Sequence, residues 1–316
     1  MRIILSAILL FTTVFTALAQ DSQDIMTILR IPTGAHAAAL GGDNISVIED
    51  DASFAMSNPA LLSSVSHQTV SLGYMNYMSG VNMGTAGYTH VINDKLTVGG
   101  SIQYINYGSL KQRDAQNNDL GNFSPMDIVF EPIVSYTLAK NLVGGVGGKF
   151  IYSKIGSYTS TAAAVDLGLN YYHPELDLSA SITVKNLGGQ LSAYNDEYEH
   201  LPTDVMLGVT KGLGESMPFR LSLTMMDLGH WDYSFLQHAC IGLDLLLTPE
   251  FYIAGGYNLR RAHEMKIKDG EGKESSHGAG FSIGAGISLE RFKLNVSYGK
   301  YHVSASSLMV NIAFNL

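Results

Sequence analysis

The sequence predicts an all-β protein, a 14-stranded antiparallel transmembrane β-barrel with a small N-terminal periplasmic plug. Three observations lead to this prediction. Residues 308–316 and many earlier stretches alternate apolar and polar side chains with a period of two, as strands with one oily face do. Only 15% of the residues are charged, against about 25% in an average soluble domain. The loops between the expected strands alternate between short and long, which is typical of outer-membrane barrels.

Residues 1–19 have the pattern of a signal peptide that is cleaved after export. Arg2 supplies the positive charge, residues 3–18 form the apolar run, and the small residues of 17–19 form the cleavage site. The run is too short for a transmembrane anchor, and no Cys lies near the cleavage site to carry a lipid. We therefore expect an exported protein whose mature chain begins at Gln20.

Residues 20–66 are expected to form the plug. Their many small residues lack the alternation of strands and suit a compact body better than a lipid-facing wall. Asn58-Pro59 predicts a turn or a helix start, because Pro is pre-organised for the first helical position. The residues that distinguish this segment are Gly34, Gly41, Gly42, Asp50, Asp51, Asn58 and Pro59.

Residues 67–316 are expected to form the barrel. The alternating pattern places strands at 67–78, 82–92, 95–108, 125–139, 141–155, 157–173, 175–187, 202–212, 216–228, 236–248, 249–261, 276–290, 291–302 and 304–316. Their number is even, as a closed bacterial barrel requires. Their lengths exceed the five or six residues that are usual in soluble sheets and match tilted membrane strands.

The connections between these strands are sorted by length. Tight turns are expected at 93–94, 140–141, 174, 213–215, 248–249 and 290–291, whereas long polar loops are expected at 109–124, 188–201, 229–235 and 262–275. The two sets alternate along the chain, which predicts short turns in the periplasm and long loops outside. The alternative architecture, a secreted β-sandwich or β-helix, gives no reason for such sorting.

Charge and cysteine content exclude some classes of protein. The net charge is −9, or −10 once Arg2 is removed with the signal peptide, and there is no basic patch. Nucleic acid is therefore not an expected partner. Cys240 is the single cysteine, so no internal disulfide can form and stability must come from closure of the sheet.

The plug residues resemble the N-terminal signature of FadL-like outer-membrane proteins, at 34–42, 50–52 and 58–61. More narrowly, the chain is similar to the PorV/PorQ family of the type IX secretion system of Bacteroidota. Its PorQ branch is favoured by 74–80, 199–202, 218–222 and Trp231. The similarity covers nearly the whole mature chain.

This resemblance implies a protein of the outer membrane, in contact with its lipid, with loops on the cell surface and no enzymatic activity. PorQ-like members are associated with PorZ, a surface-exposed subunit of the attachment complex. The resemblance therefore implies that this chain anchors a PorZ-like protein, next to the attachment-complex subunits PorU and PorV. Two alternatives stay open: a PorV-like shuttle for the C-terminal signal domains of secreted cargo, and a FadL-like transporter of hydrophobic small molecules.

Aromatic and polar side chains in two of the long loops are candidates for partner binding. Trp and Tyr dominate the energetics of protein interfaces, but the same side chains also form aromatic girdles at lipid headgroups. The sequence leaves both interpretations open. The candidates are Tyr194, Tyr198, His200, His230, Trp231, Asp232 and Tyr233.

Six ionisable residues fall on the inward face of the expected strands. One interpretation is a polar transport path. The other is a lumen filled by charges that pair with one another or with the plug, since barrel interiors are generally polar. If the resemblance holds, the plug stays in place and no substrate passes. The residues are Lys149, Asp166, Lys185, Arg220, Asp244 and Lys293.

The sequence contains no pattern that predicts catalysis, a metal site or a cofactor. Ser297 and Lys300 match the S-x-x-K spacing of penicillin-interacting serine enzymes, but they would lie on opposite faces of a strand, and the partner motifs of that chemistry are absent. The ten His residues show no ligand spacing. We therefore expect a protein that is not an enzyme.

Overall fold

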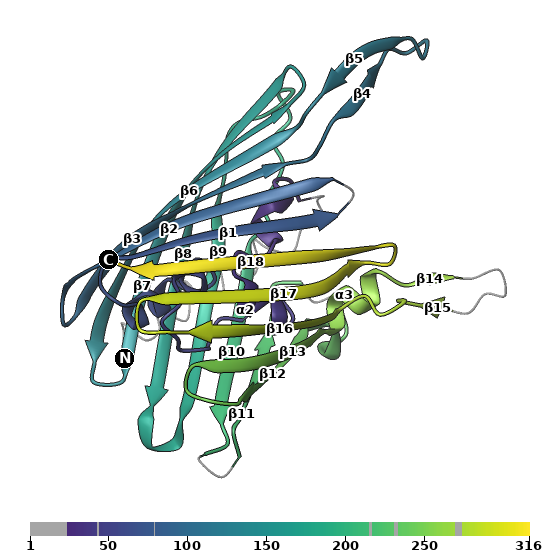
Figure 1. Cartoon of the computed structure of the whole chain (residues 1–316). Helices are drawn as coiled ribbons and strands as arrows, with labels where there is room; N and C mark the ends of the chain where they lie inside the picture. The colour runs from purple at the N-terminus through teal and green to yellow at the C-terminus, as the bar shows by residue number, and fades with distance from the viewer. Residues whose placement is uncertain (1–23, 43, 79, 215–216, 231–232, 269–273) are drawn as a thin grey trace.

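A closed antiparallel β-barrel forms the main body of the protein (Figure 1). The structure, a computed structural model, describes residues 24–42, 44–78, 80–214, 217–230, 233–268 and 274–316. The predicted signal peptide at 1–19 lies outside the described residues. In the described ranges no helix is both long and apolar enough to cross a membrane.

The described residues contain 14 barrel strands, which confirms the predicted fold class. Each strand pairs with its neighbours along the chain, and the last strand returns to pair with the first from Thr69↔Asn315 to Asn76↔Leu308. The strands are β1 (Thr69–Met78), β2 (Val81–Asn93), β3 (Leu96–Asn106), β6 (Met126–Ala139), β7 (Leu142–Ile155), β8 (Tyr158–His173), β9 (Leu178–Ser192), β10 (Asp204–Gly212), β11 (Phe219–Met225), β12 (Ala239–Leu246), β13 (Phe251–Asn258), β16 (Phe281–Ser288), β17 (Phe292–His302) and β18 (Ala305–Asn315).

The wall of the barrel is apolar on the outside and largely polar on the inside. In β18, Leu308, Ile312 and Phe314 are exposed on the outer face, while Met309 and Asn311 are buried inside. The same alternation runs through the neighbouring strands. Soluble proteins rarely expose so large an apolar face, whereas a barrel wall that faces lipid does.

The two ends of the barrel differ in the length of their connections. One end, the short-turn end, carries only brief links such as 94–95, 140–141 and 289–291. The other, the long-loop end, carries 107–125, 193–203, 226–238 and 259–280.

Several predicted boundaries are wrong because local caps or hairpins take over. The expected strand 249–261 ends at Asn258, whose side chain accepts a hydrogen bond from the Arg261 N–H and starts helix α3 (Leu259–Glu264). The strand expected at 236–248 begins at Ala239, after the short helix η5 (Phe235–His238). The other additional elements are η4 (Pro174–Leu176) and two hairpins inside the expected long polar loops. These hairpins are β4 (Leu110–Arg113) with β5 (Asp119–Phe123), and β14 (Ile267–Lys268) with β15 (Glu274–Ser275).

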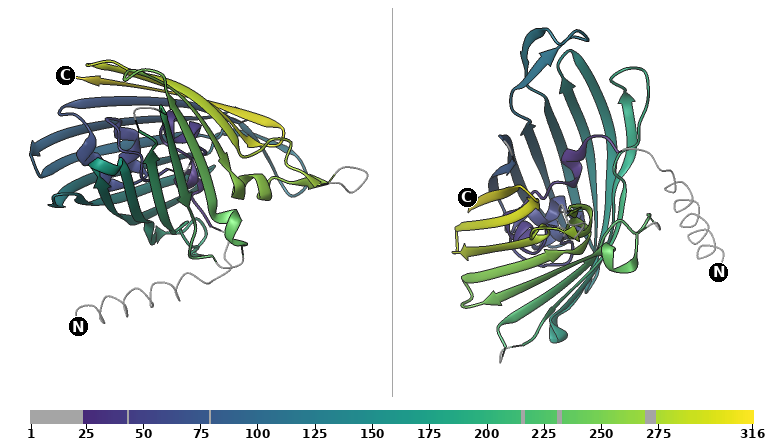
Figure 2. Two further views of the ribbon diagram at one scale, coloured as in Figure 1. Left: turned by 90° about the horizontal axis from the view of Figure 1, so that it is seen from below. Right: turned by 90° about the vertical axis from the view of Figure 1, so that its right-hand side faces the viewer.

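The N-terminal segment lies inside the ring of strands, as the view along the barrel in Figure 2 shows. It begins near the long-loop end, where the Ile25 N–H donates to the His200 carbonyl, and leads to β1 at the short-turn end. Its elements are η1 (Thr27–Arg30), α2 (Ala35–Ala39), η2 (Ala52–Met56) and η3 (Pro59–Ser64). Buried apolar residues such as Ile28, Phe54 and Leu61 pack it against the wall.

Candidate functional site

Helix α2 is defined by the glycines that flank it. Gly41 and Gly42 have φ angles of +109° and +103°, a conformation that favours glycine. The Gly42 N–H donates to Ala37 and the Gly41 N–H to Ala38, which is a Schellman termination. At the other end, a Cβ added to Gly34 would lie 2.0 Å from the Ser53 Oγ. These three glycines therefore fix the helix and its close approach to η2.

The short helices η2 and η3 begin at side-chain caps. The Asp51 carboxylate accepts from the Ser53 N–H at 2.8 Å, and Asn58 Oδ1 accepts from the Ala60 N–H at 3.0 Å. Asn58 also donates to the Ile45 carbonyl, and Pro59 occupies the first helical position. The motif residues of the plug thus serve to shape the segment that fills the lumen.

Four side chains tie α2 to the barrel wall in a closed ring of ion pairs, which we call the charge lock: His36 and Asp244 are buried, and Glu49 and Arg220 are half-buried. His36 contacts Glu49 through Nδ1 at 2.7 Å and Asp244 through Nε2 at 2.8 Å. Arg220 contacts the same two carboxylates, with 2.8 Å between its Nε and Asp244. The His36 ring also stacks on Tyr252 at 3.9 Å between centroids. Because Arg220 lies on β11 and Asp244 on β12, the lock joins the N-terminal segment to two strands.

The charges within the lock are balanced when His36 is protonated. Burial alone would lower the pKa of His36, but the carboxylates of Glu49 and Asp244 outweigh it and raise the pKa to about 10. Burial would raise the pKa of Glu49, but Arg220 and His36 hold it well below its usual range. Two cations and two carboxylates therefore face one another in the interior at neutral pH.

A second ion pair holds the segment near the short-turn end. Lys293 on β17 contacts the Asp50 carboxylate, and its Nζ donates to the Asp50 carbonyl at 2.5 Å. The same carboxylate accepts from the Ser66 N–H at 2.6 Å. Burial would raise the pKa of Asp50, but these Lys293 and Ser66 contacts lower it.

A third polar cluster, formed by Lys149, Asp166 and Asn186, shapes the wall itself. Lys149 Nζ donates to Asp166 Oδ2 and to Asn186 Oδ1, each at 2.7 Å, and the Asn186 N–H donates to Asp166 Oδ1. Asn186 has a φ of +56°, and the pairing of β8 with β9 shifts register here. The cluster therefore holds a β-bulge in β9.

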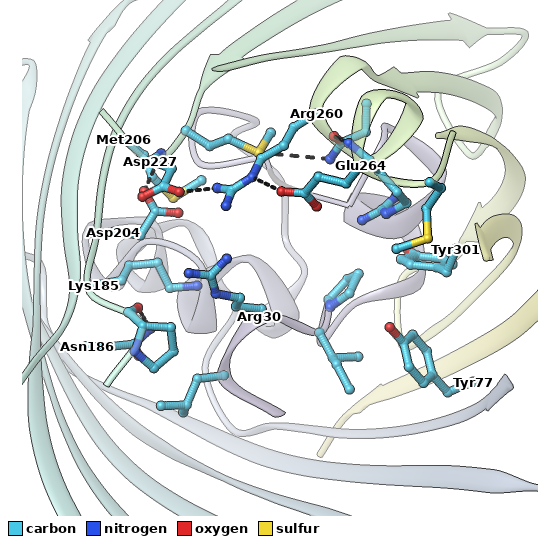
Figure 3. A pocket seen from close by; sticks show the side chains of 18 residues that line it. Arg30, Tyr77, Lys185, Asn186, Asp204, Met206, Asp227, Arg260, Glu264 and Tyr301 are labelled. Carbon is cyan, nitrogen blue, oxygen red and sulfur yellow. Dashed lines mark hydrogen bonds and ion pairs between the residues drawn. The ribbon is translucent and has the colours of Figure 1, made fainter. Parts of the chain in front are cut away.

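A cavity of about 190 Å³ lies in the lumen towards the long-loop end (Figure 3). Lys185 and Arg30 contribute positive charge to its lining, and Tyr77 and Tyr301 contribute aromatic rings. Arg260 stands between Asp227, which it contacts, and Glu264, with 2.7 Å from its Nε to the Glu264 carboxylate. The cavity is thus lined by paired charges as well as by apolar atoms. Within the described part of the chain, no three His, Cys, Asp or Glu side chains are grouped to hold a metal ion.

The described residues among the predicted partner-binding candidates lie in different surroundings. Tyr194 turns inward and donates to Ser153 Oγ at 2.5 Å, and the His200 carbonyl binds the N-terminal segment. Tyr198 is exposed. The remaining candidates belong to the 226–238 loop, where His230 contacts Asp227 and the Arg260 guanidinium lies 4.8 Å from the Tyr233 ring centre, while Trp231 and Asp232 lie outside the described residues.

The predicted inward-facing ions are distributed among four places. Arg220 and Asp244 belong to the charge lock, Lys293 holds Asp50, and Lys149 and Asp166 hold the bulge. Lys185 lines the cavity. Sequence reasoning missed His36, Glu49 and Arg260, although a single His within a run of Ala residues was a usable signal for the first.

The comparisons with known proteins give a likeness of fold. No family model matches the sequence, and a comparison with curated proteins finds no match. Among solved structures, the toluene transporter TodX of Pseudomonas putida is similar, with 13% identity, a TM-score of 0.59, and coverage of 93% of this chain and 99% of that one. A FadL homologue of Pseudomonas aeruginosa matches with 10% identity, a TM-score of 0.54, and coverage of 90% and 98%.

The fold is that of FadL-like outer-membrane barrels. A variant of TodX, a monoaromatic hydrocarbon channel with a deltaS2 mutation, is also similar, with 12% identity, a TM-score of 0.62, and coverage of 90% of this chain and 98% of that chain. The FadL-like resemblance predicted from the plug residues is thus confirmed at the level of fold.

Proposed function

We propose that this chain is an outer-membrane anchor that holds a surface protein at its long-loop end. The observation that supports this role best is the lumen, which the N-terminal segment occupies from the long-loop end to the start of β1. The charge lock and the Asp50–Lys293 pair fasten that segment to three strands of the wall. A barrel built in this way suits a scaffold better than an open conduit.

The outer-membrane location rests on the wall and on the fold. The exposed apolar face has no counterpart in soluble sheets, and the fold is shared with outer-membrane barrels. In this proposal the short turns face the periplasm and the long loops face the cell surface. The signal peptide predicted at 1–19 supplies the export route.

The partner that we propose is a PorZ-like protein in the attachment complex of type IX secretion. This identification rests on the resemblance of the plug and loop residues to the PorV/PorQ family. In this role the chain would assemble with PorU-like and PorV-like subunits, and the protein would not be an enzyme. The exposed loop residues at the long-loop end, among them Tyr198 and Phe235, supply apolar surface for such a contact.

Co-purification tests the proposal. The tagged chain is isolated in mild detergent from outer membranes of its native cells, and bound proteins are identified by mass spectrometry. We expect a PorZ-like protein at near-stoichiometric amounts. Recovery of cargo with C-terminal signal domains instead would favour the PorV-like shuttle, and recovery of the chain alone would contradict the anchor.

A second candidate function is transport of hydrophobic small molecules. The similarity of fold to a toluene transporter and the cavity beside Tyr77 and Tyr301 favour it. Against it stand the charged groups that line the cavity, since a site for hydrocarbons is mostly apolar. Uptake of labelled toluene into proteoliposomes containing the purified chain, compared with empty liposomes, tests this candidate.

A further inference from the structure

The C-terminal part of β9 has a free edge. The pairing with β10 covers only residues 178–185 and ends at Lys185↔Asp204. Residues 187–192 continue β9 and pair with β8 on one side, from Leu187↔Val165 to Ser192↔Thr161. On the other side, the described residues provide no further backbone hydrogen bonds to 187–192. We call residues 187–192 the β9 edge.

The bulge at Asn186 produces this edge. The Asn186 N–H donates to the Asp166 carboxylate, and the side-chain oxygen of Asn186 accepts from Lys149. The side-chain amide of Asn186 donates to the Pro202 carbonyl at 2.9 Å. The chain that follows β9 then turns into the lumen, where Tyr194 reaches Ser153 and Leu201 is buried. The loop therefore leaves the edge without covering it as a strand would.

The edge is exposed and carries none of the residues that usually protect a strand. Leu187 and Leu191 are 41% and 63% exposed, and a Cβ on Gly189 would meet open space. Natural edges are commonly blocked by Lys or Pro, and the sequence 187–192 contains neither. Unpaired backbone groups in such a strand can receive another chain by β-augmentation.

The position of the edge relative to the apolar wall favours a partner from the aqueous side. On the outer face of β8, exposed Val165 is followed towards the long-loop end by Ala163, Thr161 and Thr159. The outer face of β8 thus becomes more polar along the β9 edge. The edge runs from the apolar wall at Leu187, opposite Val165, to a more polar border at Ser192, opposite Thr161.

The charges beside the edge specify the kind of partner. Asp196, Glu197 and Glu199 are all exposed in the loop that follows β9. The Glu199 N–H donates to the side chain of Gln190, which keeps this acidic group next to the edge. Complementary charge on a partner strand would therefore be positive.

We propose that the β9 edge binds an extended, basic segment of the partner protein, which adds to the barrel wall as an extra strand. Backbone hydrogen bonds to 187–192 provide the binding, Leu191 contacts an apolar side chain of the partner strand, and the acidic residues of the loop contact Lys or Arg side chains. This inference rests on the proposed function, because it assumes a surface protein partner at the long-loop end.

Hydrogen exchange and photocrosslinking on the native complex test the inference. Amide exchange is measured by mass spectrometry for the complex and for the chain stripped of its partner, with 119–123 in β5 as an internal control. A photoreactive phenylalanine is placed at Leu191, and in a matched variant at Leu120, which is also exposed. The double variant Asp196→Lys/Glu197→Lys tests the contribution of charge.

We expect slower exchange at 187–192 in the complex, unchanged exchange at 119–123, and a crosslink from position 191 to a basic segment of the partner. The charge-reversed variant should lose the partner at a salt concentration that the wild type tolerates. If the partner co-purifies but 187–192 exchange equally fast with and without it, the edge is not the docking site, while the anchor function stands. If no partner co-purifies, both are overturned.

Discussion

At the residue scale, His36 explains how a small-residue helix is held in a barrel. The side chain is fully buried, and its two ring nitrogens contact carboxylates from the N-terminal segment and from β12. A buried charge is tolerated only when its partners are present, and removing one partner leaves the others uncompensated. The lock therefore makes docking of α2 depend on four side chains at once.

The pKa of His36 makes the stability of the barrel depend on pH. Because the pKa is raised from 6.5 to about 10 on folding, the contribution of His36 is complete below pH 6.5 and is lost as the pH rises through 10. We predict that the unfolding temperature of the detergent-solubilised barrel, followed by its heat-modifiable gel migration, falls between pH 7 and pH 10.5. His36→Gln should remove most of this slope, whereas His277→Gln, at an exposed site, should keep it. Equal slopes in all three proteins would count against the lock.

Lys149 holds the bulge of β9 through Asp166 and Asn186. We predict that Lys149→Met lowers the free energy of unfolding by about 3–5 kcal/mol, since it leaves a buried carboxylate without its cation. Urea unfolding in lipid vesicles measures this change. The double variant Lys149→Met/Asp166→Asn should recover part of the loss, and Lys111→Met on exposed β4 should have little effect. If Lys149→Met alone is as stable as the wild-type protein, the cluster does not stabilise the wall.

At the scale of elements, glycines in the strands let the N-terminal segment approach the wall. A Cβ on Gly145 of β7 would lie 2.2 Å from the carbonyl carbon of Pro59 and 2.3 Å from the Ala60 nitrogen. A Cβ on Gly256 of β13 would lie 2.2 Å from the carbonyl carbon of Leu40. These contacts are to backbone, which cannot move aside as a flexible side chain can. The seams between segment and wall therefore require glycine on the strand side.

Gly145 offers a test with a control in the same strand. We predict that Gly145→Ala displaces η3 and exposes the N-terminal segment to protease, while Gly148→Ala does not, because a Cβ on Gly148 meets nothing within 4 Å. Limited proteolysis of proteoliposomes, with fragments identified by mass spectrometry, measures the difference. Equal protection of both variants would contradict the packing of η3 against β7.

The strands could be predicted from the sequence because their signal is local. Alternation over ten or more residues fixes which side of a strand faces lipid, and this pattern placed the strands to within a few residues at most ends. The largest errors fell at the end of β9, expected at 187 and found at Ser192, and at the start of β16, expected at 276 and found at Phe281. Single side chains also decide local features, as Asn258 does at the start of α3 and Asn186 does at the bulge. Local periodicity carries no information on these caps and cross-strand bonds.

The contents of the lumen were harder to predict than its wall. Alternation along β11 and β12 predicts that Arg220 and Asp244 point into the lumen. Their partner His36, however, lies 208 residues before Asp244 in the sequence. No spacing rule connects residues so far apart. For the same reason, the sequence could suggest that lumen charges pair, but it could not say with which side chains.

At the scale of the whole molecule, the barrel and its N-terminal segment form one closed body. The segment contributes buried apolar residues to the interior, and its ionic contacts reach β11, β12 and β17. The described residues leave a cavity of about 190 Å³ in the lumen towards the long-loop end and a smaller one of about 20 Å³ beside Gln103 and Lys149. The proposed anchor role requires this closure.

Ion conductance tests the closure most directly. The mature chain and a variant lacking residues 24–64 are each reconstituted in planar lipid bilayers, and currents are recorded under applied voltage. We predict no stepwise current for the intact chain and open-pore currents for the variant, since removal of the segment leaves a wall with a polar interior. Steady stepwise currents through the intact chain would contradict the closed barrel and the anchor role that depends on it.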